Sequence, residues 1–195
     1  MSADVDILVD VHTHNPHPGV LSPTMAGIHP WDAERDLGFP DLSSSDIIGE
    51  TGLDYACEVS REAQQRLFEW HLVEAERLNK PVVIHCVKAF EDVMNTLGKH
   101  HLAGVILHGF VGSKEQAKRA IERGYYLSFG RRSLGSPRSC EAIKITPMEQ
   151  LFCETDDDKT LDISEIYHAV AKHKELTFEE LAKQLERNYK RLFRQ

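Results

Sequence analysis

Short apolar runs recur along the chain, and most of them end beside a polar residue or a glycine. They cover residues 7–11, 46–48, 81–84, 104–107, 125–129 and 151–153. Continuous apolar runs of this length are typical of parallel strands that are buried on both faces. The pattern therefore predicts a sheet of short parallel strands.

Helical patterns fill the intervals between these runs. Apolar residues recur at helical spacing in residues 60–79, 90–97 and 113–123, and Ser60 and Ser113 are suited to cap the first and third of these helices. Thr177 and Glu180 form a capping box that opens a last helix. Alternating strands and helices indicate βαβ units, so we expect one α/β domain over residues 1–195.

Metal-ligand side chains lie where several of these runs end. They are His12, His14, Glu50, His85, His108 and Asp156. In a parallel barrel the carboxyl ends of the strands meet on one face, where active sites form. Each of these histidines taken singly would fit a buried core position, and His-x-His alone is a weak signal. Six such residues at matching strand ends favour a metal site.

Glu50 and Asp156 are the two carboxylates with a specific predicted role. Glu50 stands between Gly49 and Gly52, which suggests a backbone crowded against a neighbour, and one carboxylate has the two oxygens needed to bridge two cations. We interpret Asp156 as a metal ligand that also orients a water molecule. Asp157 and Asp158, which follow it, are expected to be charges of a solvated loop.

The net charge argues against binding of duplex nucleic acid through a broad positively charged surface. The chain has 31 acidic and 23 basic residues, a net charge of −8. Metal ions at a small site would still bind an anionic substrate. Residues 1–6 lack a signal-peptide pattern, no apolar run spans a membrane, and the four cysteines show no Cys-x-x-Cys spacing. We expect a cytoplasmic protein with reduced thiols.

Six motifs in order carry a resemblance to a known family. They are His12-Thr13-His14, Gly27-Ile28-His29-Pro30, Gly49-Glu50-Thr51-Gly52-Leu53-Asp54, Val83-Ile84-His85, His108-Gly109-Phe110 and Glu154-Thr155-Asp156. Together they resemble the TatD-type metal-dependent hydrolases over nearly the whole chain. The resemblance implies a distorted TIM-like barrel and a deoxyribonuclease that hydrolyses phosphodiesters at DNA ends.

The resemblance also implies a two-metal centre with named ligands. One metal would take His12, His14, Glu50 and Asp156, and the other would take Glu50, His85 and His108. His29 matches a histidine that faces the substrate phosphate and is our third candidate catalytic residue beside Glu50 and Asp156. His71 matches a common family position too, but its place in an amphipathic helix favours a packing role.

Two departures from the family pattern affect the predicted fold and substrate contacts. Residues 15–26 are short and contain three prolines, so we expect no helix and no central strand there, and a barrel of about seven strands that lacks one βα unit. An arginine usual in the family is replaced by Val87, so Lys88, Arg131 and Arg132 become candidate phosphate contacts. For Arg131 and Arg132 a solvated loop is an equally good interpretation.

Three functions remain open from the sequence. The first is a two-metal phosphodiesterase, in which the cations activate a water and Asp156 accepts or orients its proton. The second is a metal-dependent amidohydrolase or lactonase on a small molecule, and the third is a non-catalytic metal-binding protein. Mixed histidine and carboxylate ligands suit Zn, Mn, Ni or Mg. A barrel lacking one unit would expose apolar surface, which a second copy of the chain could cover as a homo-oligomer.

Overall fold

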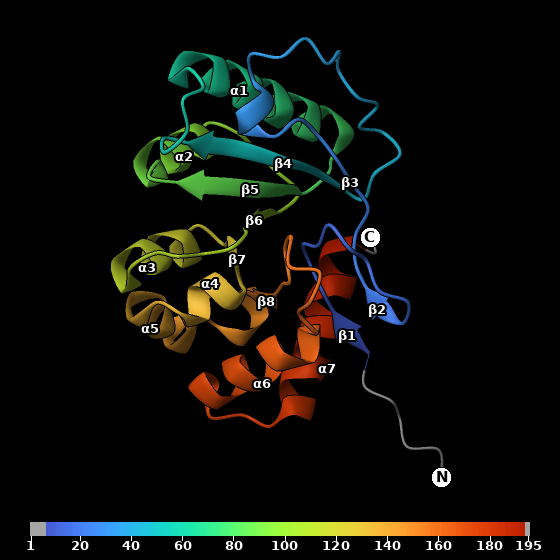
Figure 1. Cartoon of the computed structure of the whole chain (residues 1–195), viewed down its shortest axis with the longest axis vertical. Helices are drawn as coiled ribbons and strands as arrows, with labels where there is room; N and C mark the ends of the chain where they lie inside the picture. Colours follow the sequence, from blue (N-terminus) through green and yellow to red (C-terminus); the bar gives the residue numbers. More distant parts are fainter. Residues whose placement is uncertain (1–6, 194–195) are drawn as a thin grey trace. The chain divides into compact units, whose positions relative to one another are not determined.

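The chain divides into two compact units, which are described separately. The computed structural model describes residues 7–193, so the expectation about residues 1–6 lies outside the described residues. The terminal unit comprises residues 7–22 and 109–193, and the middle unit comprises residues 23–108 (Figure 1). A single domain over residues 1–195 stays a prediction.

The middle unit is built on a parallel sheet. Its strands, in spatial order, are β3 (Met25–Ala26), β4 (Ile47–Asp54), β5 (Val82–Val87) and β6 (Val105–Leu107). Its helices are the short 3₁₀ helix η1 (Pro30–Asp32), α1 (Arg61–Leu78) and α2 (Phe90–Leu97). The alternating order of strands and helices predicted from the sequence is confirmed here.

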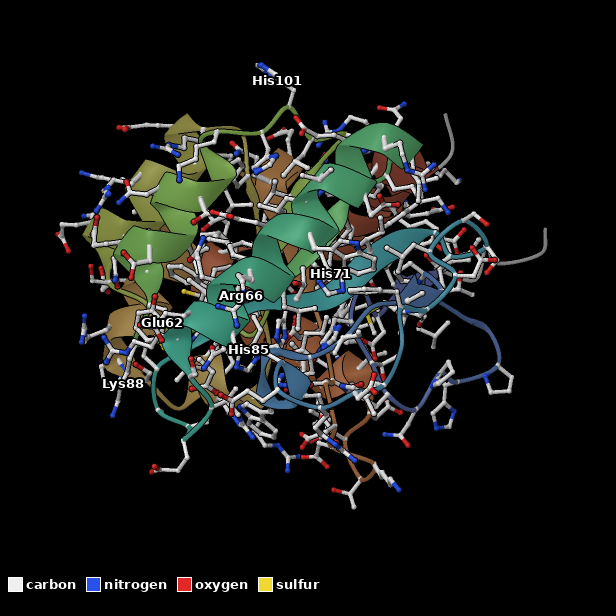
Figure 2. All side chains as sticks on the ribbon, turned by 90° about the horizontal axis from the view of Figure 1, so that it is seen from above. Glu62, Arg66, His71, His85, Lys88 and His101 are labelled. Carbon is white, nitrogen blue, oxygen red and sulfur yellow. The ribbon has the colours of Figure 1, made fainter. Side chains whose placement is uncertain are left out.

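Helix α1 covers β4 and begins and ends where the sequence predicts. The Ser60 hydroxyl accepts a hydrogen bond from the Ala63 N–H, and Asn79 ends the helix in the left-handed conformation. The helix buries Phe68, Leu72 and other small or apolar side chains (Figure 1 shows it lying along β4). Arg66 and His71 are labelled on this helix in Figure 2. Burial of the face that carries Phe68 and Leu72 fixes the helix against β4, the strand that carries Glu50.

Two glycines allow β4 and β5 to lie close together around Glu50. Gly49 has a φ of 140°, and a Cβ there would lie 2.6 Å from the Val83 carbonyl oxygen. Gly52 has a φ of 138°, and a Cβ there would overlap the carbonyl oxygen of His85. Any other residue would be strained in this conformation and would push the strands apart. The crowding predicted from the flanking glycines is confirmed.

The terminal unit contains two parallel strand pairs and most of the helices. The pairs are β1 (Leu8–Val9) with β2 (Val20–Leu21), and β7 (Tyr126–Phe129) with β8 (Leu151–Cys153). The helices are α3 (Lys114–Glu122), α4 (Arg131–Leu134), α5 (Pro137–Ile145), the 3₁₀ helix η2 (Met148–Gln150), α6 (Ile163–Lys174) and α7 (Phe178–Phe193). The predicted capping box of α7 is present, with Thr177 Oγ1 accepting from the Glu180 N–H at 3.1 Å.

Buried polar side chains tie the strands of the terminal unit to its helices. The Tyr167 hydroxyl of α6 accepts from the Val9 N–H at 2.9 Å and donates to the Val9 carbonyl at 3.0 Å. The Asn188 amide of α7 donates to the Leu151 carbonyl at 2.9 Å. Because the groups are buried, each unmade bond would cost a desolvation penalty. The strands that lead to His12 and to Asp156 are therefore held at defined positions.

Residues 15–26 contain no helix and no central strand, as predicted. They contribute only β2 and β3, each two residues long and each at the end of its sheet. The three prolines lie outside these strands, since β2 falls between Pro18 and Pro23 and β3 follows Pro23. Eight strands are assigned within residues 7–193, close to the expected number of about seven. No helix among these residues combines the length and hydrophobicity needed to cross a membrane.

Candidate active site

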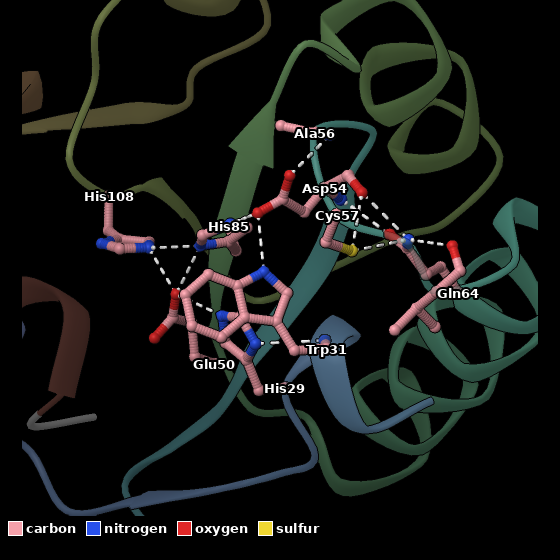
Figure 3. Close-up of polar contacts among 10 residues, drawn as sticks. His29, Trp31, Glu50, Asp54, Ala56, Cys57, Gln64, His85 and His108 are labelled. Carbon is pink, nitrogen blue, oxygen red and sulfur yellow. Dashed lines mark hydrogen bonds and ion pairs between the residues drawn. The ribbon is translucent and has the colours of Figure 1, made fainter. Parts of the chain in front are cut away.

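Three histidines of the middle unit converge on one oxygen of Glu50. Glu50 Oε1 lies 2.6 Å from His85 Nδ1, 2.8 Å from His108 Nε2 and 3.2 Å from His29 Nε2 (Figure 3). The side chain of Glu50 is only 8% exposed. His85 Nδ1 and His108 Nε2 are 3.4 Å apart. A buried carboxylate surrounded by imidazole nitrogens is a donor set for a divalent cation.

Asp54 orients His85 from the side opposite Glu50. Asp54 Oδ2 lies 3.0 Å from His85 Nε2, and the same oxygen accepts a hydrogen bond from Trp31 Nε1 at 2.7 Å. This arrangement leaves Nδ1 as the ligand nitrogen of His85 and Nε2–H as the donor to a carboxylate. Such outer carboxylates fix the ring and the tautomer of metal-binding histidines.

The Asp54 carboxylate is held in its charged form by its hydrogen bonds. Burial raises its pKa, but the hydrogen bonds from Trp31, the Ala56 N–H and His85 outweigh burial, so the pKa of Asp54 lies below its usual value. Gln64 of α1 fixes the main chain at the same residue, accepting from the Asp54 N–H at 2.7 Å and donating to the Asp54 carbonyl at 2.9 Å. The end of β4 is thus held from both sides.

His29 faces Glu50 as a hydrogen-bond donor. Its Nδ1 accepts from the Trp31 N–H at 3.2 Å, which leaves the proton of a neutral ring on Nε2, the nitrogen that points at Glu50. A protonated nitrogen does not bind a cation but donates to a carboxylate or to a phosphate oxygen. This geometry separates His29 chemically from His85 and His108.

His71 connects α1 to the loop that carries His29. Its Nε2 accepts from the Ile28 N–H at 3.0 Å, and its Nδ1 lies 2.9 Å from the Leu67 carbonyl and 3.0 Å from Thr51 Oγ1. Burial lowers the pKa of His71 to about 4, so the ring is neutral at physiological pH. His71 is thus buried in the helix, as expected, and its hydrogen bonds also link two segments that carry site residues.

The terminal unit brings together His12, His14 and Asp156. Asp156 Oδ1 lies 3.4 Å from His12 Nε2 and 3.7 Å from His14 Nε2. The two imidazole rings meet edge to face with centroids 5.3 Å apart. His12 is fully buried, whereas the side chain of His14 is 51% exposed. His12 and His14, two residues apart, therefore direct their rings toward the same carboxylate.

Main-chain pairing sets the geometry of this second cluster. The His14 N–H donates to the Asp156 carbonyl at 2.9 Å, and the Asp156 N–H donates to the His12 carbonyl at 3.0 Å. Thr13 and Asp156 form a parallel bridge, with Asp156 at a φ of 57°. The segments after β1 and after β8, far apart in the sequence, are thereby joined.

Two buried carboxylates beside this cluster were not predicted from the sequence. Asp10 accepts from the Thr155 N–H at 3.1 Å and the Thr155 hydroxyl at 2.6 Å, and burial raises its pKa to about 6. A carboxylate oxygen of Glu154 lies within 4.8 Å of a carboxylate oxygen of Asp156, and Glu154 is 1% exposed. The signals for Glu154 were its place in the Glu154-Thr155-Asp156 motif and its position two residues before a predicted ligand. Asp10 had the stronger signal, since it precedes the His-x-His motif by two residues.

Asp54 and Trp31 were also missed as site residues. Asp54 stands four positions after Glu50 on one strand, and residues an even number apart point to the same face. The spacing could therefore have identified Asp54. Nothing in the local pattern around Trp31 predicts that its indole nitrogen reaches Asp54.

The predicted phosphate contacts lie on the surface. Lys88 is exposed at the end of β5 and stands at the periphery in Figure 2, apart from His85. Arg131 and Arg132 are exposed in α4, and Arg131 forms an ion pair with Asp158 at 2.8 Å. Asp158 also accepts from the Thr160 N–H at 3.0 Å, so it stabilises its own loop.

The four cysteines are free thiols, and two of them are poor nucleophiles. Burial raises the pKa of Cys86 to about 12 and that of Cys153 well above its usual value. A nucleophile must be a thiolate, so neither side chain supports cysteine catalysis. The chemistry of the donors in each unit is instead that of a site for divalent cations.

Comparison with known proteins identifies the family. The model of the TatD related DNase family matches residues 13–194. The metal-dependent hydrolase YabD of Bacillus subtilis, itself named as uncharacterized, is 33% identical over 195 residues, covering 86% of this chain and 76% of that protein. The 3'-5' ssDNA/RNA exonuclease TatD of Shigella flexneri is 33% identical over 145 residues, covering 67% of this chain.

The chain spans only 56% of the length of that TatD exonuclease. The crystal structure of YjjV, a TatD homologue from Escherichia coli, matches with a TM-score of 0.76 at 21% identity, covering 95% of this chain and 97% of the other. That likeness shows the TIM-barrel-like α/β fold. With a family model over most of its residues and curated relatives named as metal-dependent hydrolases and nucleases, this chain belongs to the TatD-related DNase family.

Proposed function

We propose that this chain is a two-metal phosphodiesterase that acts on the ends of single-stranded DNA. The observation that carries the proposal is the convergence of His85 and His108 on Glu50, with His29 donating toward the same carboxylate. Family membership supports the reaction class. The name of the Shigella flexneri relative supports a single-stranded nucleic acid as the substrate.

The proposed metal ligands are those expected from the resemblance. One ion would be held by His12, His14, Asp156 and Glu50, and the other by Glu50, His85 and His108. Support comes from each unit separately, since the nitrogens of His12 and His14 face Asp156 and those of His85 and His108 face Glu50. The donors are imidazoles and carboxylates, which fit Zn, Mn, Ni or Mg.

The residues of the chain have distinct proposed roles in hydrolysis. Divalent ions, when bound, would lower the pKa of a water molecule and neutralise negative charge on the phosphoryl oxygens. Asp156 accepts and orients the proton of the attacking water. His29 donates its Nε2–H to a phosphate oxygen, and Asp54 keeps the His85 ring in the ligating tautomer.

An overall negative charge is compatible with this substrate. The net charge of −8 would repel a polyanion, but the cations concentrate positive charge where the phosphate reacts. Lys88, Arg131 and Arg132 remain predicted phosphate contacts. Arg131 would have to leave Asp158 to reach a phosphate, whereas Lys88 has an exposed side chain that is available without such a change.

Metal analysis followed by activity measurements tests the proposal. The purified protein should contain close to two divalent ions per chain, lose activity on single-stranded DNA after chelation, and recover it with Mn, Zn, Ni or Mg. An Asp158→Asn variant is the control for a nearby carboxylate outside the ligand sets. Two bound ions without DNA hydrolysis, together with turnover of a lactone or amide, would instead establish the small-molecule hydrolase. Absence of bound metal after all four additions would contradict both.

Two further expectations accompany the proposed activity. A cytoplasmic location is supported by the four free thiols, because such thiols are typical of reducing compartments. The proposed homo-oligomer is tested by measuring the molar mass of the purified protein in solution.

A further inference from the structure

An exposed indole stands beside the ligand cluster of the middle unit. Trp31 is 58% exposed, although tryptophan is among the side chains whose burial contributes most to folding. It follows Pro30 in η1, directly after the His29 segment. Its ring centroid lies 4.6 Å from that of His29 and 6.2 Å from that of His85, both edge to face. A large apolar surface is thus kept in solvent next to charged and polar groups.

The exposed ring is held rigidly. Trp31 Nε1 donates to Asp54 Oδ2 at 2.7 Å, and the Trp31 N–H donates to His29 Nδ1 at 3.2 Å (Figure 3 shows the indole alongside His29 with its nitrogen directed at Asp54). Both the main chain and the side chain of this residue are therefore fixed by site residues. A ring that is already immobilised loses little conformational entropy when a ligand stacks on it.

The position of the ring suits a nucleotide better than an isolated phosphate. The sugar separates a base from its phosphate, so a phosphodiester at His29 leaves a base outside the ligand cluster, within reach of the neighbouring indole. Aromatic side chains bind single strands in this way, because every base has a flat π-face. Stacking also provides affinity that does not depend on positive charge, which suits a chain with a net charge of −8.

We propose that Trp31 is a stacking platform for a nucleobase of the substrate strand, next to the phosphodiester that is hydrolysed. This inference rests on the proposed phosphodiesterase function and adds to it a site for the base. It predicts that the enzyme distinguishes strands with bases from strands of the same length and charge without them.

The test compares an oligothymidylate with an abasic strand of equal length. Hydrolysis is measured on phosphodiester strands with the metal-loaded protein, and binding is measured on phosphorothioate strands that resist cleavage. Trp31 and Trp70 are the only tryptophans, so a Trp70→Phe protein reports on Trp31 fluorescence alone. We expect the oligothymidylate to quench this fluorescence and to bind about tenfold more tightly than the abasic strand.

Two substitutions of Trp31 separate stacking from support of Asp54. Trp31→Phe keeps an aromatic face but loses the N–H donor, and Trp31→Gln keeps an N–H donor but loses the ring. We expect the preference for bases to persist in the phenylalanine variant and to disappear in the glutamine variant, mainly through KM. A thermal melt of each variant checks that it is folded.

Each outcome decides between the two proposals. Equal binding and equal hydrolysis of both strands by the parent, or an unchanged preference in Trp31→Gln, would overturn stacking and leave the phosphodiesterase intact. Quenching with a preference for bases but no hydrolysis of either strand would support the platform and contradict the phosphodiesterase. Neither quenching nor hydrolysis would overturn both.

Discussion

The two units hold their ligand-type side chains by different means. In the middle unit, Glu50 and His85 lie inside paired strands, are nearly buried, and are fixed by side chains such as Asp54. In the terminal unit, His14 is half exposed, and the cluster is fixed by main-chain hydrogen bonds to Asp156.

This difference determines how far the effect of a substitution spreads. In the middle unit, changing one side chain disturbs its hydrogen-bonded neighbours. In the terminal unit, the main-chain pairing remains after a side chain is changed, so the loss is confined to the ligand itself. Substitutions in the two units therefore test the comparison directly.

The largest effect is expected for Glu50→Gln in the middle unit. An amide is neutral and presents a donor end, so it cannot hold two cations together as a carboxylate can. We expect kcat/KM on single-stranded DNA to fall on the order of a thousandfold, with the melting temperature within about 4 °C of the parent. Hydrolysis is measured with saturating Mn or Zn. Near-normal rates at normal stability would contradict the two-metal mechanism.

Asp156→Asn tests the terminal unit. The substitution removes a predicted ligand and the proton acceptor, so we expect a loss of about a hundredfold in kcat. The main-chain bonds with His12 and His14 do not involve its side chain, so stability should change little.

The matched control for Asp156→Asn is Asp158→Asn, two residues further along the same loop. Asp158 pairs with Arg131 and accepts from the Thr160 N–H, so this change should lower stability slightly and leave activity intact. Equal losses of activity in both variants would show that the loop contributes more to the site than we assign to it.

The sequence predicts the ligands better than it predicts the strands that carry them. The apolar runs at 46–48 and 81–84 stop before Glu50 and His85, yet β4 continues to Asp54 and β5 to Val87. Gly49 and Gly52 indicate a crowded backbone, but not that the neighbour is β5. The identity of the neighbouring strand depends on the tertiary context.

Helix prediction fails where the local signal is weak or was overlooked. Helix α4 is four residues long, and α5 buries only Ser139, Ala142 and Ile143, so neither has a full apolar stripe. Helix α6 does have one, since Ile163, Ile166, Tyr167 and Val170 recur at helical spacing and are buried. Its absence from the predicted elements is an oversight, whereas the positions of Trp31 and His71 depend on contacts between distant segments.

Asp54→Asn tests whether support of His85 by a neighbouring side chain matters. We expect a loss of ten- to a hundredfold in metal affinity or activity, because the amide no longer offers a charged acceptor to His85 and Trp31. Metal titration of the purified variant measures the effect separately from turnover. Gln65→Ala, at a half-buried position of α1, serves as the control, since its amide contacts Glu69 and Thr96 and not Asp54. Unchanged metal affinity in Asp54→Asn would show that main-chain pairing alone positions His85.

The prediction for His71→Gln concerns stability at low pH and not activity. His71 is buried with its pKa lowered to about 4, against 6.5 for the unperturbed side chain. Above pH 6.5 the ring is neutral in both the folded and the unfolded state, so it adds no pH dependence. Between pH 6.5 and 4 the unfolded chain takes up a proton that the folded chain excludes, so stability falls as the pH falls.

The glutamine variant removes this titration and keeps the hydrogen bonds. Its carbonyl oxygen can accept from the Ile28 N–H and its amide can donate to the Leu67 carbonyl, as the imidazole does. Denaturant unfolding at a series of pH values should show the parent losing about 3 kcal/mol more than the variant between pH 6.5 and 4. Parallel pH profiles would mean that His71 takes up its proton at the same pH in the folded and the unfolded chain. Below that pH the Ile28 N–H bond to Nε2 could not exist, and other contacts would have to link α1 to the His29 loop.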